Sequence, residues 1–331
     1  MKKVIFSLGL AVLLFSGCTD KAVQNEKQEE DLTKVRIGWQ VPWATEGQLT
    51  QVLKHTDLLQ ENNLEGDFKG FSYGGPLNEA ALAGEVDVLF TADQPAMMLM
   101  SKSDDWVIIG RLMYNRVSLY APPKSEIENV SDLAGKTVAM PFGAAAQRMA
   151  LLEEKKAGLD PKTDVNNINL GIYEQSDLVR DKEAKTWGDI DALAGFDPTP
   201  AIFEEKGLVK NLAVGKIVSV VVMNKTYIEN NPEAPANFLK AFRGAYEYYR
   251  SNTEQANAWF TEEAGLDITP EALAIAASVE PNLHKEKIRL DFIEDDYRIM
   301  DEAVNFLVEQ EIMPKYINPR DVINLDYLYS L

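Results

Sequence analysis

Apolar and polar positions follow one repeating order through the first two thirds of the chain: a short apolar run, then a stretch with helical spacing. The short runs have the length and the β-branched and aromatic content of strands, and the stretches after them carry apolar residues every three or four positions. The strand-like runs lie at residues 35–40, 67–72, 85–91, 136–141 and 189–195. Alternating strands and helices of this kind predict an α/β body with parallel-dominated sheets.

The last part of the chain follows a different pattern, because helical spacing continues there without a strand-like run of useful length. The helical stretches lie at residues 235–251, 253–263, 270–279 and 294–310. We therefore expect a helical C-terminal section that packs on one lobe. The folded body begins near Val35 and runs for roughly 300 residues, a length that favours two lobes over one.

Five places where a strand is followed by a helix form the candidate binding site. In open α/β sheets, ligands bind beyond the carboxyl ends of the strands, where helix starts present unpaired N–H groups. The residues that we expect to contact a ligand there are Gln40, Trp43, Ser72, Tyr73, Gly74, Asp93, Gln94, Phe142, Gly143, Ala144, Ala145, Ala146, Phe196 and Asp197.

Three alanines distinguish the fourth of these junctions, in the stretch MPFGAAAQRM. Ala144, Ala145 and Ala146 offer an anion only backbone N–H donors and the dipole of the following helix, without a hydroxyl side chain. Arg148 follows one turn into that helix, and we expect it to lie at the surface. This junction therefore predicts a ligand whose anionic part, if it has one, is held by the backbone alone.

Aromatic and acidic side chains are frequent at the other junction positions. Asp93 and Asp197 each precede a helix, where a carboxylate either caps the helix or faces a ligand. The aromatic rings, such as Trp43 and Phe196, either belong to the core or line a pocket. A pocket with flat rings and carboxylates suits an aromatic, cationic or amine-bearing ligand better than a bare oxyanion.

The N-terminus has the features of an export signal. Two lysines precede an apolar run at residues 4–15, which is too short to cross a bilayer. The run ends in LFSGC, which resembles the lipobox of bacterial lipoproteins, so we expect a signal peptide at residues 1–17 and a lipid on Cys18. The polar residues 18–34 are typical of a flexible tether. These features predict an extracytoplasmic protein that a lipid anchors to the cell membrane.

Charge and residue content narrow the classes of function. The chain has 33 basic and 52 acidic residues, a formal net charge of −19, which argues against a nucleic-acid partner. Cys18 is the only cysteine, so an internal disulfide is excluded. His55 and His284 lie in helical stretches away from the junctions, and no catalytic or metal-ligating set is evident. We therefore expect a protein that is not an enzyme, without catalytic residues, metal or cofactor.

Four segments together resemble the substrate-binding lipoproteins of bacterial ABC importers, in the branch for sulfonates, taurine, nitrate and thiamine-pyrimidine precursors. In chain order they are FSYGGPLNEAALAGEVDVLFTADQPA, VSDLAGKTVAMPFGAAAQ, KKAGLDP and GDIDALAGFDPTPAIFEEKG. The resemblance extends from Val35 to about Tyr249. It implies the two-lobed periplasmic-binding-protein fold, with lobe 1 at residues 35–116 and 214–331, lobe 2 at residues 117–213, and hinge strands in VSLYAPP and KIVSVVVMN.

The resemblance also implies a function: delivery of a small organic solute, sulfonate-like or nitrogenous and aromatic, to an ABC permease by closure of a cleft. We expect a monomer. A thiamine-type aminopyrimidine precursor is an alternative ligand, because family members often carry Ser or Thr where this chain has three alanines. A pyrimidine-synthase-like enzyme would need a cysteine-rich motif, which a single cysteine cannot supply. A surface lipoprotein without a transport role would need a partner surface rather than a cleft.

Overall fold

The computed structural model describes residues 32–330, which belong to one compact unit. The predicted signal peptide, Cys18 and most of the predicted tether lie outside the described residues. The first strand, β1 (Thr33–Gln40), begins two residues before Val35, where we expected the body to begin. One reason is that the hydroxyl of Tyr227 donates to the carbonyl of Lys34 (2.9 Å) and holds the start of the strand on the body.

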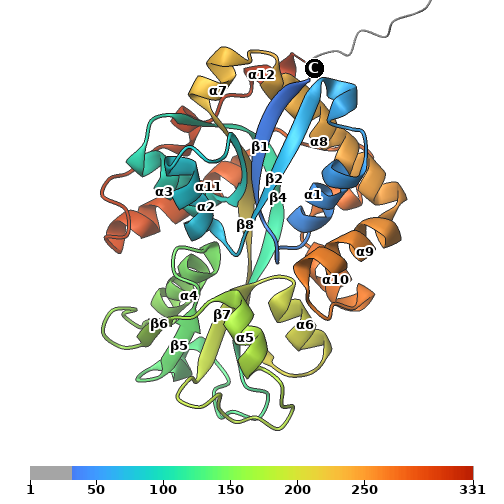
Figure 1. The fold of residues 1–331 in the computed structure, drawn as a ribbon. Helices are drawn as coiled ribbons and strands as arrows, with labels where there is room; N and C mark the ends of the chain where they lie inside the picture. Colours follow the sequence, from blue (N-terminus) through green and yellow to red (C-terminus); the bar gives the residue numbers. More distant parts are fainter. Residues whose placement is uncertain (1–31, 331) are drawn as a thin grey trace, which may run out of the picture. The chain divides into compact units, whose positions relative to one another are not determined.

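One mixed sheet of eight strands runs through the body in the order β2-β1-β3-β8-β4-β7-β5-β6 (Figure 1). The other strands are β2 (Leu64–Phe71), β3 (Val88–Ala92), β4 (Trp106–Ala121), β5 (Thr137–Met140), β6 (Asn166–Asn169), β7 (Ala192–Phe196) and β8 (Lys210–Asn224). Neighbouring strands are parallel in the two outer parts of the sheet, and every pair that includes β4 or β8 is antiparallel. The predicted α/β class is confirmed. The sequence did not reveal β6, because its residues, NNIN, are polar and half exposed.

Two long strands connect the upper and lower parts of the body (Figure 1). β4 has 16 residues and β8 has 15, and they pair from Trp106 opposite Asn224 to Ala121 opposite Lys210. β3 joins the upper end of this pair and β7 the lower end. We call the part with β1–β3 lobe 1 and the part with β5–β7 lobe 2. Of the two apolar runs expected as hinge strands, VSLYAPP lies in β4 only as far as Ala121, and KIVSVVVMN lies wholly in β8. Both strands begin before these runs because the preceding residues also pair.

Helices follow the strands as the alternation predicts. They are α1 (Glu46–His55), α2 (Gly74–Leu82), α3 (Asp93–Lys102), α4 (Ala145–Lys156), α5 (Ile172–Leu178) and α6 (Thr199–Glu205). The C-terminal section is helical, as expected, with α7 (Lys225–Asn230), α8 (Ala234–Ser251), α9 (Thr253–Ala264), α10 (Pro270–Ala277), α11 (Glu294–Glu309) and α12 (Asp326–Tyr329). Short 3-10 turns occur at η1 (Gln60–Asn62), η2 (Val130–Leu133), η3 (Pro281–Leu283) and η4 (Pro319–Val322).

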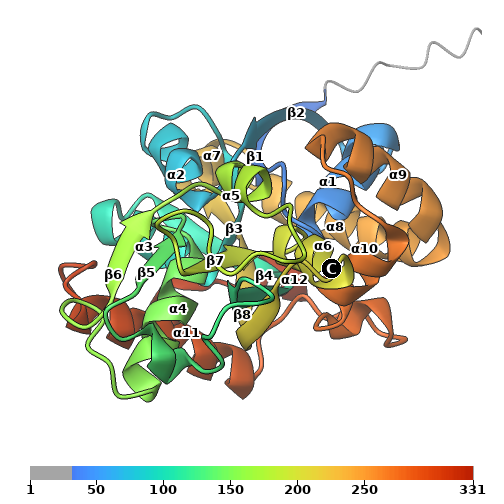
Figure 2. The same ribbon diagram turned by 90° about the horizontal axis from the view of Figure 1, so that it is seen from below.

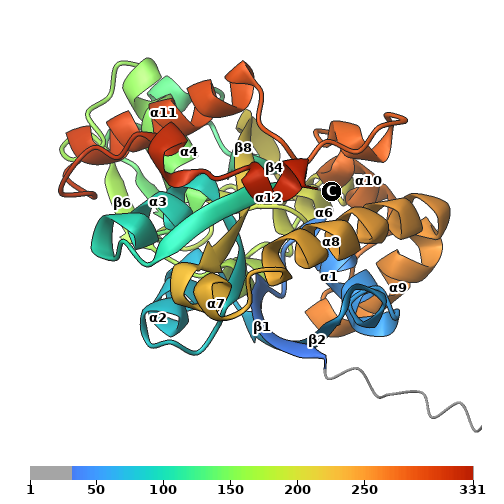
Figure 3. The same ribbon diagram turned by 90° about the horizontal axis from the view of Figure 1, so that it is seen from above.

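Both faces of the lobe 1 sheet are covered by helices. Val221 and Met223 of β8 point into a core with α1 and α8, whereas Val220 and Val222 point into a second core with α2, α3 and α11. Figure 3 shows α8 and α11 on opposite sides of the long strands. Burial on both faces explains why residues 217–223 of β8 are apolar except for Ser219 and do not alternate with polar residues.

Lobe 2 is built in the same way on a smaller scale. Val138 and Met140 of β5 pack with α4, and Ala139 between them packs on the opposite face with α6. Figure 2 shows lobe 2 from below, with α6 beside α10 of the C-terminal section. The C-terminal helices therefore contact both lobes, whereas the sequence alone predicted that they pack on one lobe only.

Glu154 of α4 is a buried carboxyl that makes the stability of the protein depend on pH. Its Oε2 accepts a hydrogen bond from Asn167 Nδ2 (2.9 Å), and its Oε1 has no partner among the described residues. Burial raises the pKa of Glu154 from 4.5 to about 7, and the Asn167 bond opposes this shift. The folded state therefore binds more protons than the unfolded state between these two pH values, so this carboxyl lowers stability as pH rises.

We expect Glu154→Gln to raise the free energy of unfolding by about 1–3 kcal/mol at pH 8, because the neutral amide avoids burying a charge. At pH 4.5 the same change should have little effect, since the carboxyl is protonated in the folded state. Urea unfolding at both pH values measures the difference. An equal gain at both pH values would show that packing rather than ionisation is responsible.

Candidate ligand-binding site

The loop after β1 reaches from lobe 1 to lobe 2. The N–H of Ala44 donates to the carbonyl oxygen of Asp197 (3.2 Å), and the Trp43 ring meets the Phe196 ring edge-on, with centroids 5.9 Å apart. The Asn115 side chain of β4 donates to the Ala44 carbonyl (3.0 Å) and holds the loop against β4. The first and fifth junctions, which are far apart in the sequence, are therefore in direct contact.

The apolar core of lobe 2 on the α4 side extends to lobe 1, and this cluster contains residues from four of the five junctions. Its members from the predicted site are Trp43, Ala144, Ala145, Ala146 and Phe196, with Ala92 beside Asp93 and with the half-buried Tyr73 packed against it. All of these except Tyr73 are buried, so the methyl groups of the alanines are in contact with neighbouring side chains. The structure thus brings six of the fourteen predicted site residues together where the lobes meet, and we call this region the interlobe layer.

Phe142, Ser72 and Gly74 differ from the other predicted site residues. Phe142 is 39% exposed and does not belong to the cluster. Ser72 is half-buried. Gly74 is buried at the start of α2, where a Cβ atom would come within 2.6 Å of Pro95. Gly74 therefore allows α2 and α3 to approach each other closely.

Fewer N–H groups are free at the start of α4 than the sequence suggested. The N–H of Phe142 donates to Asn169 Oδ1 (2.9 Å), and the N–H of Gly143, whose φ is +82°, donates to Gln147 Oε1 (2.9 Å). The N–H of Ala144 donates to the carbonyl of Pro141 (3.2 Å). Because the first residues of a helix have no intrahelical acceptors, Ala145 and Ala146 are the two positions of the junction that can offer N–H donors to a ligand.

Arg148 is buried, and the expectation that it lies at the surface was wrong. Its Nη2 lies 2.7 Å from Asp93 Oδ2, which forms an ion pair between α4 of lobe 2 and α3 of lobe 1. Asp93 Oδ1 accepts the N–H of Gln94 (2.7 Å). Burial raises the pKa of Asp93, and Arg148 opposes this shift. Asp93 is the first residue of α3, and its carboxylate is already paired within the chain.

Asp197 is also paired within the chain, with an arginine that sequence reasoning missed. Arg116 of β4 places Nη1 3.1 Å from Asp197 Oδ2, and it also contacts Glu204 of α6. Asp197 Oδ1 accepts the N–H of Ala201 (2.9 Å), so the carboxylate also contacts the first turn of α6, whose N-cap residue is Pro198. Burial raises the pKa of Asp197 to about 6, against the opposing effect of Arg116.

Several buried polar atoms around the interlobe layer have no hydrogen-bond partner in the described part of the chain. They are Trp43 Nε1, Glu46 Oε2, Thr91 Oγ1, Gln94 Nε2, Gln94 Oε1 and Arg148 Nε. Gln40 is better satisfied, because its N–H donates to Glu46 Oε1 (2.8 Å) and its side chain reaches the Phe90 carbonyl (3.5 Å). Buried polar groups without partners are rare in folded proteins, so these six atoms, each at or within three residues of a predicted junction residue, support a candidate site here. The sequence did not single out Glu46 or Thr91, although each lies within three residues of a predicted junction residue.

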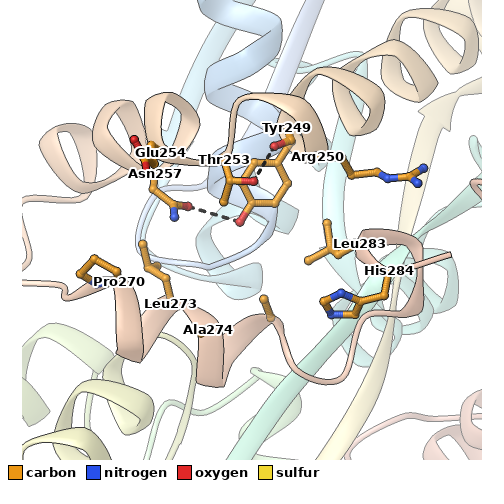
Figure 4. Close-up of a pocket in the computed structure, with 11 residues that line it drawn as sticks. Tyr249, Arg250, Thr253, Glu254, Asn257, Pro270, Leu273, Ala274, Leu283 and His284 are labelled. Carbon is orange, nitrogen blue, oxygen red and sulfur yellow. Dashed lines mark hydrogen bonds between the residues drawn. The ribbon is translucent and has the colours of Figure 1, made fainter. Parts of the chain in front are cut away.

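A cavity of about 460 Å³ lies elsewhere, among α8, α9, α10 and η3 (Figure 4). Tyr249 and Asn257, which share a hydrogen bond of 3.3 Å, line one side of it, and Leu273 and His284 line the other side. None of the predicted site residues lines this cavity. His55, the other histidine, stacks on Trp259 with ring centroids 4.7 Å apart. Both imidazoles thus lie away from the interlobe layer, as the sequence predicted.

No helix within residues 32–330 has the length and apolar character needed to cross a membrane. In the same range, no group of three or more His, Cys, Asp or Glu side chains is arranged to hold a metal ion.

A family model described as NMT1/THI5 like matches residues 74–256, more than half of the chain, and the chain therefore belongs to this family. A comparison with curated protein sequences found no match. Solved structures with the same fold include the alkanesulfonate-binding protein SsuA from Xanthomonas axonopodis pv. citri, bound to MOPS. It is 18% identical, with a TM-score of 0.72 over 89% of this chain and 99% of that one.

The periplasmic aliphatic sulphonate binding protein SsuA from Escherichia coli is similar at 23% identity, with a TM-score of 0.71 over 88% of this chain and 97% of that one. The desulfurization enzyme DszB also shares the fold, at 12% identity and a TM-score of 0.63 over 90% of this chain and 98% of that one. These similarities confirm the periplasmic-binding-protein fold. Because binding proteins and an enzyme both use it, the fold by itself does not assign a function.

Proposed function

We propose that this protein is an extracytoplasmic solute-binding protein that delivers a small organic solute to an ABC permease. The observation that carries this proposal is the interlobe layer, where buried polar atoms without partners come from both lobes. Trp43, Thr91 and Gln94 lie on the lobe 1 side, and Arg148 lies on the lobe 2 side. A solute held between the lobes would satisfy these groups and would be enclosed when the lobes close about β4 and β8.

The chemistry of the layer supports the two ligand types considered from the sequence, a sulfonate-like solute or a nitrogenous aromatic one. The rings of Trp43 and Phe196 provide apolar walls, and Trp43 Nε1 and Arg148 Nε provide donors. The side-chain amide of Gln94 can donate and accept. A thiamine-type aminopyrimidine precursor would also suit this mixture of flat rings and paired donors and acceptors.

Ion pairs between the lobes support cleft closure as the working motion. Arg148 pairs with Asp93, Lys155 with Glu309, and Lys206 with Asp267. In each pair the cation belongs to lobe 2, and the anion belongs to lobe 1 or to the C-terminal section. The two lysine pairs are solvent-exposed and contribute little individually, whereas the Arg148 pair is buried.

Mass spectrometry of the full chain purified without denaturation tests the proposed function. We expect one small organic solute to be released on unfolding, chemically unchanged by the protein. After its removal, solution scattering should show a larger radius of gyration, and adding the solute back should restore the compact form. A turnover product in place of the solute would favour an enzyme with this fold, and identical scattering profiles in both states would contradict cleft closure.

Anchoring by Cys18 is part of the proposal and yields a separate prediction. LFSGC and the polar residues after it motivate the expectation that lipid on Cys18 holds the protein at the membrane. We expect Cys18→Ser to move the protein from the membrane fraction to the soluble fraction, because one lipid-modified cysteine is the only anchor that we infer. Immunoblots of the two fractions measure the change. Membrane association equal to that of the wild type would contradict the anchor.

A further inference from the structure

Glu46 is a buried carboxyl in the first turn of α1, directly after the loop that joins the lobes. Its Oε1 accepts the N–H of Gln40 (2.8 Å), the last residue of β1. Its Oε2 is buried and has no hydrogen-bond partner within the described residues. The side chain is thus turned back toward the carboxyl end of β1, the edge of the sheet where the proposed binding layer lies.

The other two carboxylates of the layer differ from Glu46 in having cations. Asp93 is 2.7 Å from Arg148, and Asp197 is 3.1 Å from Arg116. Glu46 forms no ion pair with any residue in the range 32–330. Glu46 is a buried carboxyl with a hydrogen-bond donor at one oxygen only and no cation nearby. A cationic ligand could donate to the second oxygen and neutralise the charge.

The surroundings of Glu46 place it on the lobe 1 wall of the site. Trp43, three residues earlier, packs on Phe196 of lobe 2 and has an unpartnered Nε1. Ala44, two residues earlier, donates its N–H to Asp197 of lobe 2. Gln40, which binds one oxygen of Glu46, reaches the Phe90 carbonyl of β3 with its side chain. Glu46 is therefore connected through its immediate neighbours to both lobes.

We propose that Glu46 binds a protonated amine of the solute and so selects an amine-bearing ligand. This inference rests on the proposed solute-binding function and adds the class of ligand to it. The sequence pointed to Asp93 and Asp197 for this role, and the structure shows both of them paired with arginines. The amine would donate to Glu46 Oε2, with the Gln94 amide or Thr91 hydroxyl as further acceptors in the same layer.

The ionisation of Glu46 provides an independent signature. Burial raises the pKa of Glu46 well above its ordinary value, and the hydrogen bond from Gln40 opposes this shift. No charged side chain contributes to the shift. A cationic ligand would favour the charged form, so binding should release a proton wherever the free protein holds it. The affinity for an amine should then fall as pH is lowered.

Two matched pairs of probes test the assignment: homotaurine against propanesulfonate, and benzylamine against benzyl alcohol. Each pair keeps the body of the molecule and changes whether it carries an amine. Calorimetry on the full chain should show tighter binding of at least one amine-bearing probe than of its partner, by about 10- to 100-fold, as expected for a hydrogen bond between charged groups. Titrations in buffers of different ionisation enthalpy should show the released proton.

Glu46→Gln is the decisive variant, because its amide can still accept the Gln40 N–H while it loses the charge. We expect it to abolish both the preference for the amine and the proton release. Glu154→Gln is the matched control, since Glu154 is also a buried carboxyl with one unpartnered oxygen but lies in lobe 2, away from the layer. It should leave the preference unchanged, and melting temperatures of both variants check that they fold.

Three outcomes would overturn the assignment: equal binding within both pairs, an amine preference that persists in Glu46→Gln, and no binding of either amine-bearing probe. Binding of propanesulfonate or benzyl alcohol alone would remove the role of Glu46 and leave the proposed solute-binding function standing. Failure of all four probes together with the absence of a co-purifying solute would count against the function itself.

Discussion

Arg111→Met is expected to lower the free energy of unfolding by about 3–5 kcal/mol, the usual effect of removing one partner of a buried ion pair. Arg111 of β4 is fully buried, with Nη2 2.8 Å from Glu280 Oε2 and Nε 3.7 Å from Asp296 Oδ1. Methionine fills similar space but removes the positive charge. Glu280 and Asp296 would then stay buried in the core of lobe 1 without the cation that they share. Chemical denaturation of the full chain measures the loss.

A movement of the lobes should not reduce this loss of stability, because Arg111, Glu280 and Asp296 all belong to lobe 1 and its C-terminal section. The N–H of Tyr114 also donates to Glu280 Oε2 (2.6 Å), which fixes the segment before η3 to β4. Arg298→Met is the matched control: Arg298 also has two acidic partners, but its side chain is 63% exposed. Its change should cost less than about 1 kcal/mol. Equal losses in the two variants would contradict the importance of burial.

Arg148→Met is expected to open the cleft while leaving the free energy of unfolding within about 1 kcal/mol of the wild type. In the closed arrangement the change would leave Asp93 buried without its cation, which costs about 3–5 kcal/mol. Separation of the lobes lets water reach Asp93 and avoids that cost. Solution scattering of the solute-free chain should therefore show a larger radius of gyration for the variant than for the wild type.

Lys206→Met provides the control for this prediction. Lys206 also pairs across the lobes, with Asp267, but both side chains are in contact with solvent. Because an exposed pair contributes at most about 1 kcal/mol, its loss should change the scattering curve far less. If Arg148→Met unfolds as readily as Arg111→Met and keeps its compact form, then the Asp93–Arg148 pair stabilises the fold rather than the closed state.

Arg111 and Arg148 also show which contacts cannot be inferred from the sequence. Arg111 and Arg148 each stand among apolar or mixed residues, and nothing in their local pattern indicates a partner. Their partners lie 169 and 55 residues away in the chain. Such pairings depend on which strand ends and helices face each other after folding, so the local spacing of apolar residues does not predict them. The same reason explains why Arg148 was expected at the surface.

The sequence by itself determined the alternation of strands and helices and the helical C-terminal section. Each of these follows from local periodicity, which the chain carries whatever its partners are. Only the tertiary structure decided which junction groups are satisfied. It paired Asp93 and Asp197 with arginines, turned Phe142 outward, occupied the N–H groups of Phe142 and Gly143, and left Glu46 buried without a cation. Burial and pairing are properties of contacts between distant segments, so they arise only when the lobes pack together.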